Sequence, residues 1–247
     1  MKSLLTAAWG LAVATAIADI PTYKVATEAH YAPFVFVDEN SNIKGFDPDL
    51  LSAIGEKEGF KVKFSSELWD QMFKKLDNGQ VQIISAGLLE SPKRREKYGV
   101  SDSYAVSKRI AIFTDAKHKD KDISDLAGLR YVTQAGTTNV EYLKTLFGPD
   151  AKILGEQTQY MQIKALLKNE ADVVYDDYHV LVPYLNRFKD NLYYISDNKV
   201  GSGINFVMLT QKDDLELLEK INEGLKAVKA DGTYQKIYDK WFNHNAG

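Results

Sequence analysis

The 247-residue sequence contains no cysteine, which excludes disulfide bonds, thiolate metal sites, thiol catalysis and a lipid-modified N-terminal cysteine. Histidine is scarce as well, and no two of the four histidines form the H-x-x-x-H pair that is typical of a zinc site on a helix. From these absences we expect no metal and no other cofactor.

The chain also lacks a strong excess of positive or negative charge, and it lacks a long apolar run after its first 18 residues. The formal net charge is −3, from 31 basic and 34 acidic residues, which argues against general nucleic-acid binding. Beyond residue 18 no apolar run is long enough to cross a bilayer. There is no G-x-x-x-x-G-K-[ST] loop, so any ATP hydrolysis must belong to a partner. The length allows one large domain or two small ones.

The N-terminal segment differs in kind from the rest of the chain. Lys2 precedes an apolar run over residues 4–17 that is rich in alanine and leucine. Residues 16–18, Ala-Ile-Ala, fit the small-x-small cleavage pattern, which predicts a signal peptide over residues 1–18 and a mature start at Asp19. A buried N-terminal helix is the alternative. We expect an exported, soluble mature protein.

Segments typical of strands and helices alternate through the remaining chain, which predicts an α/β fold. Short apolar runs predict strands at residues 23–27, 61–65, 81–84, 109–113, 129–133, 153–154, 173–175 and 205–209. Capping residues and helical spacing predict helices at residues 47–59, 70–78, 136–147 and 158–169, from 91 and 177, across 218–228, and ending near 242. The pattern restarts after residue 110, so two α/β units are expected.

Two stretches near the N-terminus, residues 27–34 (TEAHYAPF) and 45–50 (GFDPDL), indicate a loop that leaves a buried strand, a turn and a helix start. Asp47 is expected to cap that helix. Glu28 and Tyr31 then lie after the carboxyl end of the strand, which is where open α/β sheets bind ligands.

Three other segments carry candidate binding groups. Lys93, Arg94 and Arg95 fall in the first turn of a predicted helix, where positive charge is disfavoured unless an anion binds there. The alternative is a solvated charged face. Asp177 ends an apolar strand, where it could meet a ligand ammonium or cap the next helix. The segment 134–139 (QAGTTN) opens a helix whose free N–H groups could bind an anion, although an ordinary helix start is the alternative.

Taken together, these segments resemble the amino-acid-binding family of periplasmic solute receptors. Segments similar to the family's phrases T-D-x-x-Y-x-P-F, G-F-D-x-D-L, A-G-x-T-x-T-P-x-R, x-x-G-T-T and D-A-x-x-x-D occur here in order, with Glu28 where the family commonly has Asp, and the ending over residues 230–242 is also similar. The resemblance covers nearly all of the mature chain. It implies two α/β lobes with a ligand cleft between them, joined by two hinge strands near 106–110 and 201–204. Lobe 1 would comprise residues 19–107 and 203–247, and lobe 2 residues 108–202.

The resemblance also implies a role for each site residue. Arg94 would bind the ligand carboxylate together with Thr137 and Thr138 from the other lobe, and Asp177 would bind the ammonium. The pocket for the ligand side chain would be formed by Glu28, Tyr31, Trp69 and Gln134. Ala86, Gly87 and Leu89 would also contact the ligand. Their stretch departs from the family, because Leu89 stands where a serine or threonine hydroxyl is usual.

The implied function is that of a periplasmic receptor that captures a polar L-amino acid and delivers it to the membrane permease of an ABC importer. The receptor would be a monomer and would bind no nucleic acid. Glu28 at the side-chain end favours a ligand with a cationic or amide side chain. The alternative is an enzyme on the same fold that resembles cyclohexadienyl dehydratase, with Glu28 or His30 as acid or base.

Overall fold

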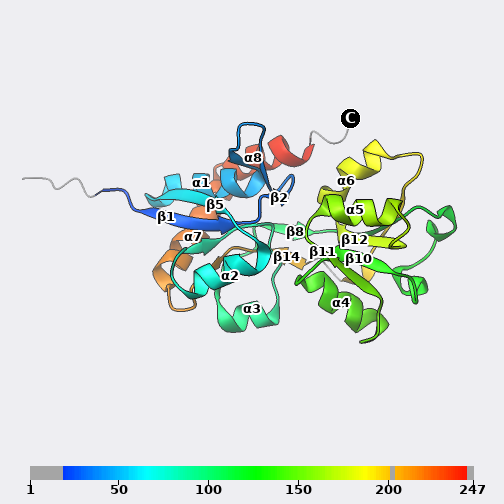
Figure 1. Cartoon of the computed structure of the whole chain (residues 1–247). Helices are drawn as coiled ribbons and strands as arrows, with labels where there is room; N and C mark the ends of the chain where they lie inside the picture. Colours follow the sequence, from blue (N-terminus) through cyan, green and yellow to red (C-terminus); the bar gives the residue numbers. More distant parts are fainter. Residues whose placement is uncertain (1–18, 201–203, 244–247) are drawn as a thin grey trace, which may run out of the picture.

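The computed structural model describes residues 19–200 and 204–243. The predicted signal peptide and most of the predicted second hinge segment, residues 201–203, lie outside the described residues. Figure 1 shows two α/β lobes side by side, joined by a narrow pair of strands. Within the described ranges, no helix is both long and apolar enough to span a membrane.

Lobe 1 is built on a mixed five-stranded sheet. Its order is β5 (Lys61–Ser66), β1 (Thr22–Thr27), β6 (Ile83–Ile84), β15 (Leu209–Thr210) and β7 (Gly99–Val100). β1 runs parallel to β5 and β6, whereas β15 is antiparallel to its neighbours. The helices of this lobe are α1 (Phe46–Glu58), α2 (Trp69–Asp77), α3 (Pro92–Lys97), α7 (Leu215–Ala230) and α8 (Thr233–Phe242). A small antiparallel sheet joins β2 (His30–Tyr31), β3 (Val35–Val37) and β4 (Ile43–Lys44).

Lobe 2 has its own five-stranded sheet. Its order is β11 (Ile153–Glu156), β10 (Tyr131–Gln134), β12 (Val173–Asp177), β9 (Arg109–Phe113) and β13 (Tyr193–Ser196). The α-helices of this lobe are α4 (Thr138–Phe147), α5 (Gln159–Leu167) and α6 (Tyr178–Arg187). Short 3₁₀ turns are η1 (Ala116–His118), η2 (Ile123–Leu126) and η3 (Asn198–Val200).

The two lobes are connected by β8 (Ala105–Ser107) and β14 (Ile204–Phe206), which pair with each other in antiparallel register. The chain leaves lobe 1 along β8, builds lobe 2, and returns along β14 to add β15 to the first sheet. This is the predicted two-lobe α/β fold with two connecting strands. The boundaries predicted at 107/108 and 202/203 stay a prediction.

The start of α1 differs from the expectation, because Asp47 does not cap it. The helix begins at Phe46, with Gly45 as its N-cap residue and no side-chain cap. At Gly45 a Cβ atom would lie 2.2 Å from the carbonyl oxygen of Phe34, so the turn passes too close to the backbone for another residue type. Carbonyl oxygens of the preceding loop accept the first helical N–H groups, so a side-chain cap is not needed.

As a result, the side chain of Asp47 is turned into the protein. Its Oδ2 atom accepts hydrogen bonds from Ser85 Oγ (3.1 Å), Gly87 N (2.8 Å) and Tyr104 OH (3.1 Å). Burial raises the pKa of Asp47 to about 6 against these hydrogen bonds. Asp47 therefore links the start of α1 to the loop after β6 and to the segment that leads into β8.

Candidate ligand-binding cleft

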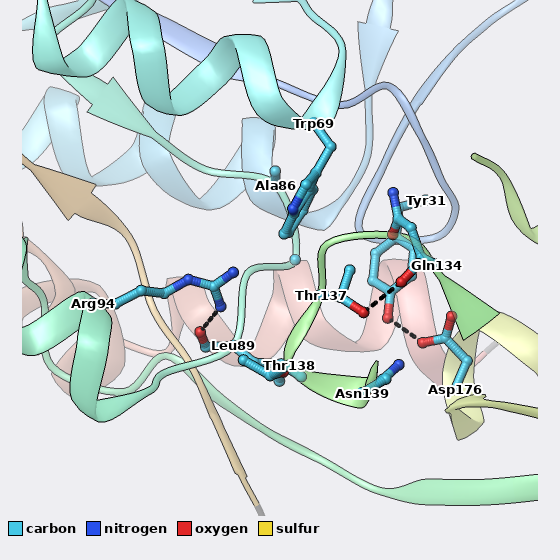
Figure 2. A pocket seen from close by; sticks show the side chains of 11 residues that line it. Tyr31, Trp69, Ala86, Leu89, Arg94, Gln134, Thr137, Thr138, Asn139 and Asp176 are labelled. Carbon is cyan, nitrogen blue, oxygen red and sulfur yellow. Dashed lines mark hydrogen bonds between the residues drawn. The ribbon is translucent and has the colours of Figure 1, made fainter. Parts of the chain in front are cut away.

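A cavity lies between the lobes, and Figure 2 shows the side chains around it. Lobe 1 contributes Tyr31, Trp69, Ala86, Gly87, Leu89 and Arg94, and lobe 2 contributes Gln134, Thr137, Thr138, Asn139 and Asp176. Nine of the eleven residues predicted from the sequence are among them. The two predicted residues outside the lining are Glu28 and Asp177, and the two additional ones are Asn139 and Asp176.

Arg94 is the buried member of the basic run at the start of α3. Ser91 caps this helix by accepting a hydrogen bond from Arg94 N. The neighbours Lys93 and Arg95 are exposed and form ion pairs with glutamates. Arg94 is 8% exposed, and within the described ranges no acidic side chain forms an ion pair with it.

The contacts of the Arg94 guanidinium leave it suited to an anionic ligand. It donates to the carbonyl oxygen of Leu89 and lies 5.6 Å from the ring centroid of Trp69 and 5.5 Å from that of Phe73. Burial lowers the pKa of Arg94 to about 10, so the group stays charged at neutral pH. Because a buried cation without a counter-charge is costly, the geometry favours a ligand carboxylate at this end.

The N-terminus of α4 faces the same cavity from lobe 2. The side chain of its N-cap residue, Thr137, donates to Gln134 O (2.8 Å) and does not cap the helix. The first N–H groups of a helix have no partner within that helix and carry partial positive charge. Trp69 Nε1 donates to Gly136 O (3.2 Å) from the opposite lobe and holds the rim of the cavity together. An anion held by Arg94 would therefore meet donors on both lobes.

The adjacent acids at the end of β12 have different surroundings. Asp176 lines the cavity, and its Oδ1 atom accepts hydrogen bonds from Tyr31 OH (2.8 Å) and Asp177 N (2.8 Å). Its Oδ2 atom is buried and has no hydrogen-bond partner in the described part of the chain. Burial raises the pKa of Asp176, and the charge of Arg109 opposes that rise. Asp176 thus offers a free carboxylate oxygen beside the cavity.

Asp177 has no free oxygen. Its Oδ1 atom accepts from His179 N (2.8 Å) and caps α6, while its Oδ2 atom accepts from Ser107 Oγ (2.7 Å) and Lys108 N (3.0 Å). The structure therefore gives Asp177 the capping role that the sequence had left open, together with a tie to the connecting strand β8. It places Asp176, which was not among the site residues predicted from the sequence, beside the cavity.

Glu28 stands behind the lining and connects the lobes. The side-chain amide of Gln134 donates to its carboxylate. Glu28 is buried, and that burial raises its pKa to about 7, with the hydrogen bond from Gln134 opposing the rise and the charge of Asp176 adding to it. Glu28 and Gln134 would together contact the part of a ligand that lies between Gln134 and Tyr31.

The remaining wall is apolar. Tyr31 stacks on Phe34 with a centroid distance of 5.6 Å, and Leu89 adds an almost fully buried side chain. Gly87 has a φ of +57°, and a Cβ atom there would lie 2.6 Å from the Tyr31 ring. Gly87 therefore lets the loop after β6 approach Tyr31. In residues 19–200 and 204–243 no three His, Asp or Glu side chains come together as metal ligands.

Two α/β lobes, two connecting strands and a charged cavity between the lobes define a two-lobe ligand-binding receptor. Residues 23–244 match the sequence model of the bacterial extracellular solute-binding proteins, family 3, and the chain belongs to this family.

Similar proteins include ABC transporter arginine-binding protein 1 of Escherichia coli (strain K12). It is 28% identical over 224 residues, which cover 87% of this chain and 88% of that protein. A solved structure, the arginine-, lysine-, histidine-binding protein ArtJ from Geobacillus stearothermophilus, is 30% identical with a TM-score of 0.82, covering 90% of this chain and 95% of that chain. The ancestral amino acid-binding protein AncCDT-1, a precursor of cyclohexadienyl dehydratase, is 31% identical with a TM-score of 0.78 and the same coverage.

Proposed function

We propose that this chain binds an L-amino acid between its lobes and delivers it to an ABC importer. The observation that carries the proposal is a pair of buried, opposite charges on the two sides of one cavity, Arg94 from lobe 1 and Asp176 from lobe 2 (Figure 2). An L-amino acid carries a carboxylate and an ammonium on one carbon atom, so it can meet both charges at once. Each charge lost from water is then replaced by a partner.

The ligand's backbone groups would be held as follows. Arg94 binds the carboxylate, and the N–H groups at the start of α4 bind it from the other lobe. The free Oδ2 atom of Asp176 accepts from the ammonium. This assignment replaces Asp177 with Asp176, because Asp176 lines the cavity and Asp177 does not.

The ligand's side chain would be cationic or would carry an amide. Glu28 and Asp176 place two carboxyl groups near the Gln134 end of the cavity. These groups can accept from a cationic or amide side chain, whereas an acidic side chain would add a third carboxyl group there. The apolar faces of Trp69 and Tyr31 suit a long methylene stem. Arginine, lysine and histidine, after which the Geobacillus binding protein is named, fit these requirements.

Ligand binding would be coupled to lobe closure. Tyr31 and Asp176 bond across the lobes, as do Trp69 and Gly136, so the cavity is complete only when the lobes are together. We propose that residues 19–107 with 203–247 move as one body and residues 108–202 as the other. A ligand that contacts both bodies binds the closed form more tightly and shifts the equilibrium toward it.

The proposed setting follows from the family and the N-terminal sequence. The family consists of extracellular solute-binding proteins. We propose export to the periplasm through a cleavable signal peptide over residues 1–18 and a monomeric receptor. The partner would be the permease of the importer, which receives the closed, loaded form.

An enzyme resembling cyclohexadienyl dehydratase is the second candidate. The observation that favours it is Glu28, because a buried carboxyl group with a pKa of about 7 is suited to proton transfer. Against it, Gln134 already engages that carboxylate. We propose that the chain is not an enzyme. Incubation with prephenate or arogenate, followed by product analysis, separates the two candidates, since turnover would support the dehydratase.

A thermal-shift screen over the common L-amino acids tests the proposed function. A ligand present at a hundred times its dissociation constant should add roughly 2.7 kcal/mol to the free energy of unfolding. We expect stabilisation by one or more of arginine, lysine, histidine and glutamine. Stabilisation by glutamate or aspartate alone would overturn the proposed side-chain class, and no response to any amino acid would count against the proposed function.

A further inference from the structure

A second cavity lies against β8, the first connecting strand, and among the described residues it shares no lining residue with the ligand cleft. We call it the β8 cavity. Lobe 1 supplies most of its walls, from the segment that ends in β8 and from α7 and α8. Lobe 2 supplies His179 at the start of α6, which approaches α8 of the other lobe (Figure 1). The proposed binding mode gives this cavity no role.

The walls of the β8 cavity are largely aromatic. The ring centroid of Phe242, at the end of α8, lies 4.7 Å from that of Tyr238 and 5.2 Å from that of Phe34. The imidazole of His179 meets Phe242 from the opposite lobe, with the ring centroids 4.8 Å apart. Tyr234 adds a further ring, 6.1 Å from that of Tyr238. Because aromatic rings attract one another in edge-to-face and offset arrangements, these walls favour a flat aromatic occupant.

Two exposed lysines line the same cavity. Lys229 of α7 donates to Ser103 O (2.9 Å), and its Nζ atom lies 5.5 Å from the ring centroid of Tyr234. Lys108 follows directly after β8. Within residues 19–200 and 204–243, neither lysine forms an ion pair with an acid. The cavity therefore combines aromatic walls with two positive charges that have no direct counter-charge.

In the part of the chain that the structure describes, no acid lines the β8 cavity. The acids around it are held by other groups. Asp177 contacts Nδ1 of His179 (3.2 Å) and caps α6, and Asp239 accepts from amide side chains one turn away on either side. Burial lowers the pKa of Lys229, with the charge of Asp102 opposing this. A lining with two ammonium groups and no carboxylate favours an anionic occupant.

We propose that the β8 cavity is a second ligand site and that it takes a small aromatic carboxylate. The ring of such a ligand packs against the aromatic walls around Phe242, and its carboxylate meets Lys108 and Lys229. A lysine ammonium binds an anion as a point charge, so the site does not require the two-pronged geometry of an arginine. This inference is independent of the proposed amino-acid site, because the two cavities are lined by different side chains.

Three probes separate the contribution of the ring from that of the charge. Phenylacetate carries both, cyclohexylacetate keeps the carboxylate without an aromatic ring, and phenethylamine keeps the ring with the opposite charge. Calorimetry with the wild type should show one saturable site for phenylacetate, a few-fold weaker binding of cyclohexylacetate and no binding of phenethylamine. Arg94→Ala, which removes the cation of the ligand cleft, should bind phenylacetate like the wild type. Absence of saturable phenylacetate binding, equal affinity for either other probe, or loss of binding in Arg94→Ala would overturn the inference.

Substitutions in the lining give a matched comparison. Val106 is 48% exposed on β8, so Val106→Glu adds a carboxylate to the cavity without disturbing the core, and Val106→Gln is its uncharged match. Val106→Glu should bind phenylacetate several-fold more weakly than Val106→Gln. Lys229→Gln should weaken binding about twofold to fivefold, whereas Lys226→Gln, on the same helix but outside the lining, should not. Equal affinities in the two Val106 variants, or unchanged affinity in Lys229→Gln, would contradict the proposed site.

NMR locates the bound probe directly. We expect intermolecular nuclear Overhauser effects between phenylacetate and the rings of Phe242, Tyr238 and His179. Contacts with Trp69 or Tyr31 instead would place the probe in the ligand cleft and would overturn the inference. Neither result depends on amino-acid binding, so the proposed function can fail while this inference stands.

Discussion

At the scale of single residues, two neighbouring acids perform different tasks because of what lies around them. The sequence places Asp176 and Asp177 together after an apolar strand, and both could cap a helix or face a cleft. The two acids differ because of Ser107, which lies 70 positions before Asp177. Its hydroxyl group donates a hydrogen bond to the Asp177 carboxylate and so links Asp177 to β8. No local pattern contains that contact, so the sequence could predict an acidic site at this strand end but not which acid serves it.

For other residues the local signal predicted the helix start but not the ligand role. The starts of α3 and α4 each follow from a short motif, whereas the family resemblance supplied the expected carboxylate contacts of Arg94 and of the start of α4, which stay a prediction. The inward orientation of the Asp47 side chain could not be predicted from the sequence, because it depends on how closely Gly45 passes Phe34 in three dimensions.

The division of tasks predicts opposite effects of two substitutions. Asp176→Asn removes the charge beside the cavity and should lower the affinity for L-arginine by roughly 2–5 kcal/mol with little loss of stability. Asp177→Ala removes a helix cap and the bond to Ser107, and should lower the free energy of unfolding by roughly 1–2 kcal/mol. Calorimetry measures the ligand affinity of both variants, and denaturant titration measures their free energy of unfolding. The reverse pattern would show that Asp177, and not Asp176, binds the ligand ammonium.

Glu28 should make stability depend on pH. Its folded-state pKa of about 7 lies above the ordinary value of 4.5, so between these values the folded state holds a proton that the unfolded state releases. Stability therefore falls as pH rises through this window, by up to about 3 kcal/mol for this group.

Glu28→Gln removes that contribution. We expect the variant to match the wild type near pH 4.5 and to be more stable at pH 8, while binding L-arginine less tightly because the anion is lost. Buried acids elsewhere, such as Asp47, contribute equally to both proteins and cancel in the difference. Denaturant titrations at the two pH values measure the difference in free energy of unfolding between the two proteins. If that difference is the same at both pH values, Glu28 does not titrate in this range.

At the scale of elements, the loop between β6 and α3 shapes the cleft more than any single helix does. Asp47 fixes its backbone at Gly87, and the carbonyl oxygen of Leu89 accepts from Arg94. Leu89 also forms an isolated antiparallel bridge with Phe206 of β14, which connects the cavity wall to the second connecting strand. The loop thus lines the cavity and also contacts the connecting strand β14.

Gly87→Ala tests the shape of this loop. The new Cβ atom would lie 2.6 Å from the Tyr31 ring, at a φ of +57°, so it should displace Tyr31 and weaken ligand binding. Gly128→Ala is the matched control: φ there is +82°, but no atom lies within 4 Å of the new Cβ. The left-handed backbone should cost both variants roughly 1–2 kcal/mol of stability, and the contact with Tyr31 should add to that loss in Gly87→Ala. Equal ligand affinities in the two variants would show that the approach to Tyr31 does not matter.

At the scale of the whole molecule, the sequence pattern alone predicted two α/β units but not how the chain connects them. The return of the C-terminal part to lobe 1 rests on β15 pairing with β6, and a two-residue strand has no pattern of its own. The family resemblance supplied that connection. Pairing partners far apart along the chain are set by the packing of the assembled lobes, which short-range periodicity does not record.

Closure of the lobes should change the overall dimensions. Small-angle scattering should give a smaller radius of gyration with saturating L-arginine than without ligand, because ligand contacts on both lobes favour the closed form (Figure 1). The Arg94→Ala variant should show no such change at the same concentration. An unchanged radius in the saturated wild type would contradict closure, while leaving binding itself intact.

The most direct measurement is a calorimetric titration of the wild type, Arg94→Ala and Arg95→Ala with L-arginine. Arg95 is the exposed neighbour on the same helix and is paired with Glu90, so its loss controls for charge. We predict binding to the wild type and to Arg95→Ala with similar affinity, and a loss of roughly 2–5 kcal/mol in Arg94→Ala, which removes one partner of a buried charge pair. Near-normal affinity in Arg94→Ala would contradict the central claim that the interlobe cleft holds an amino acid through Arg94.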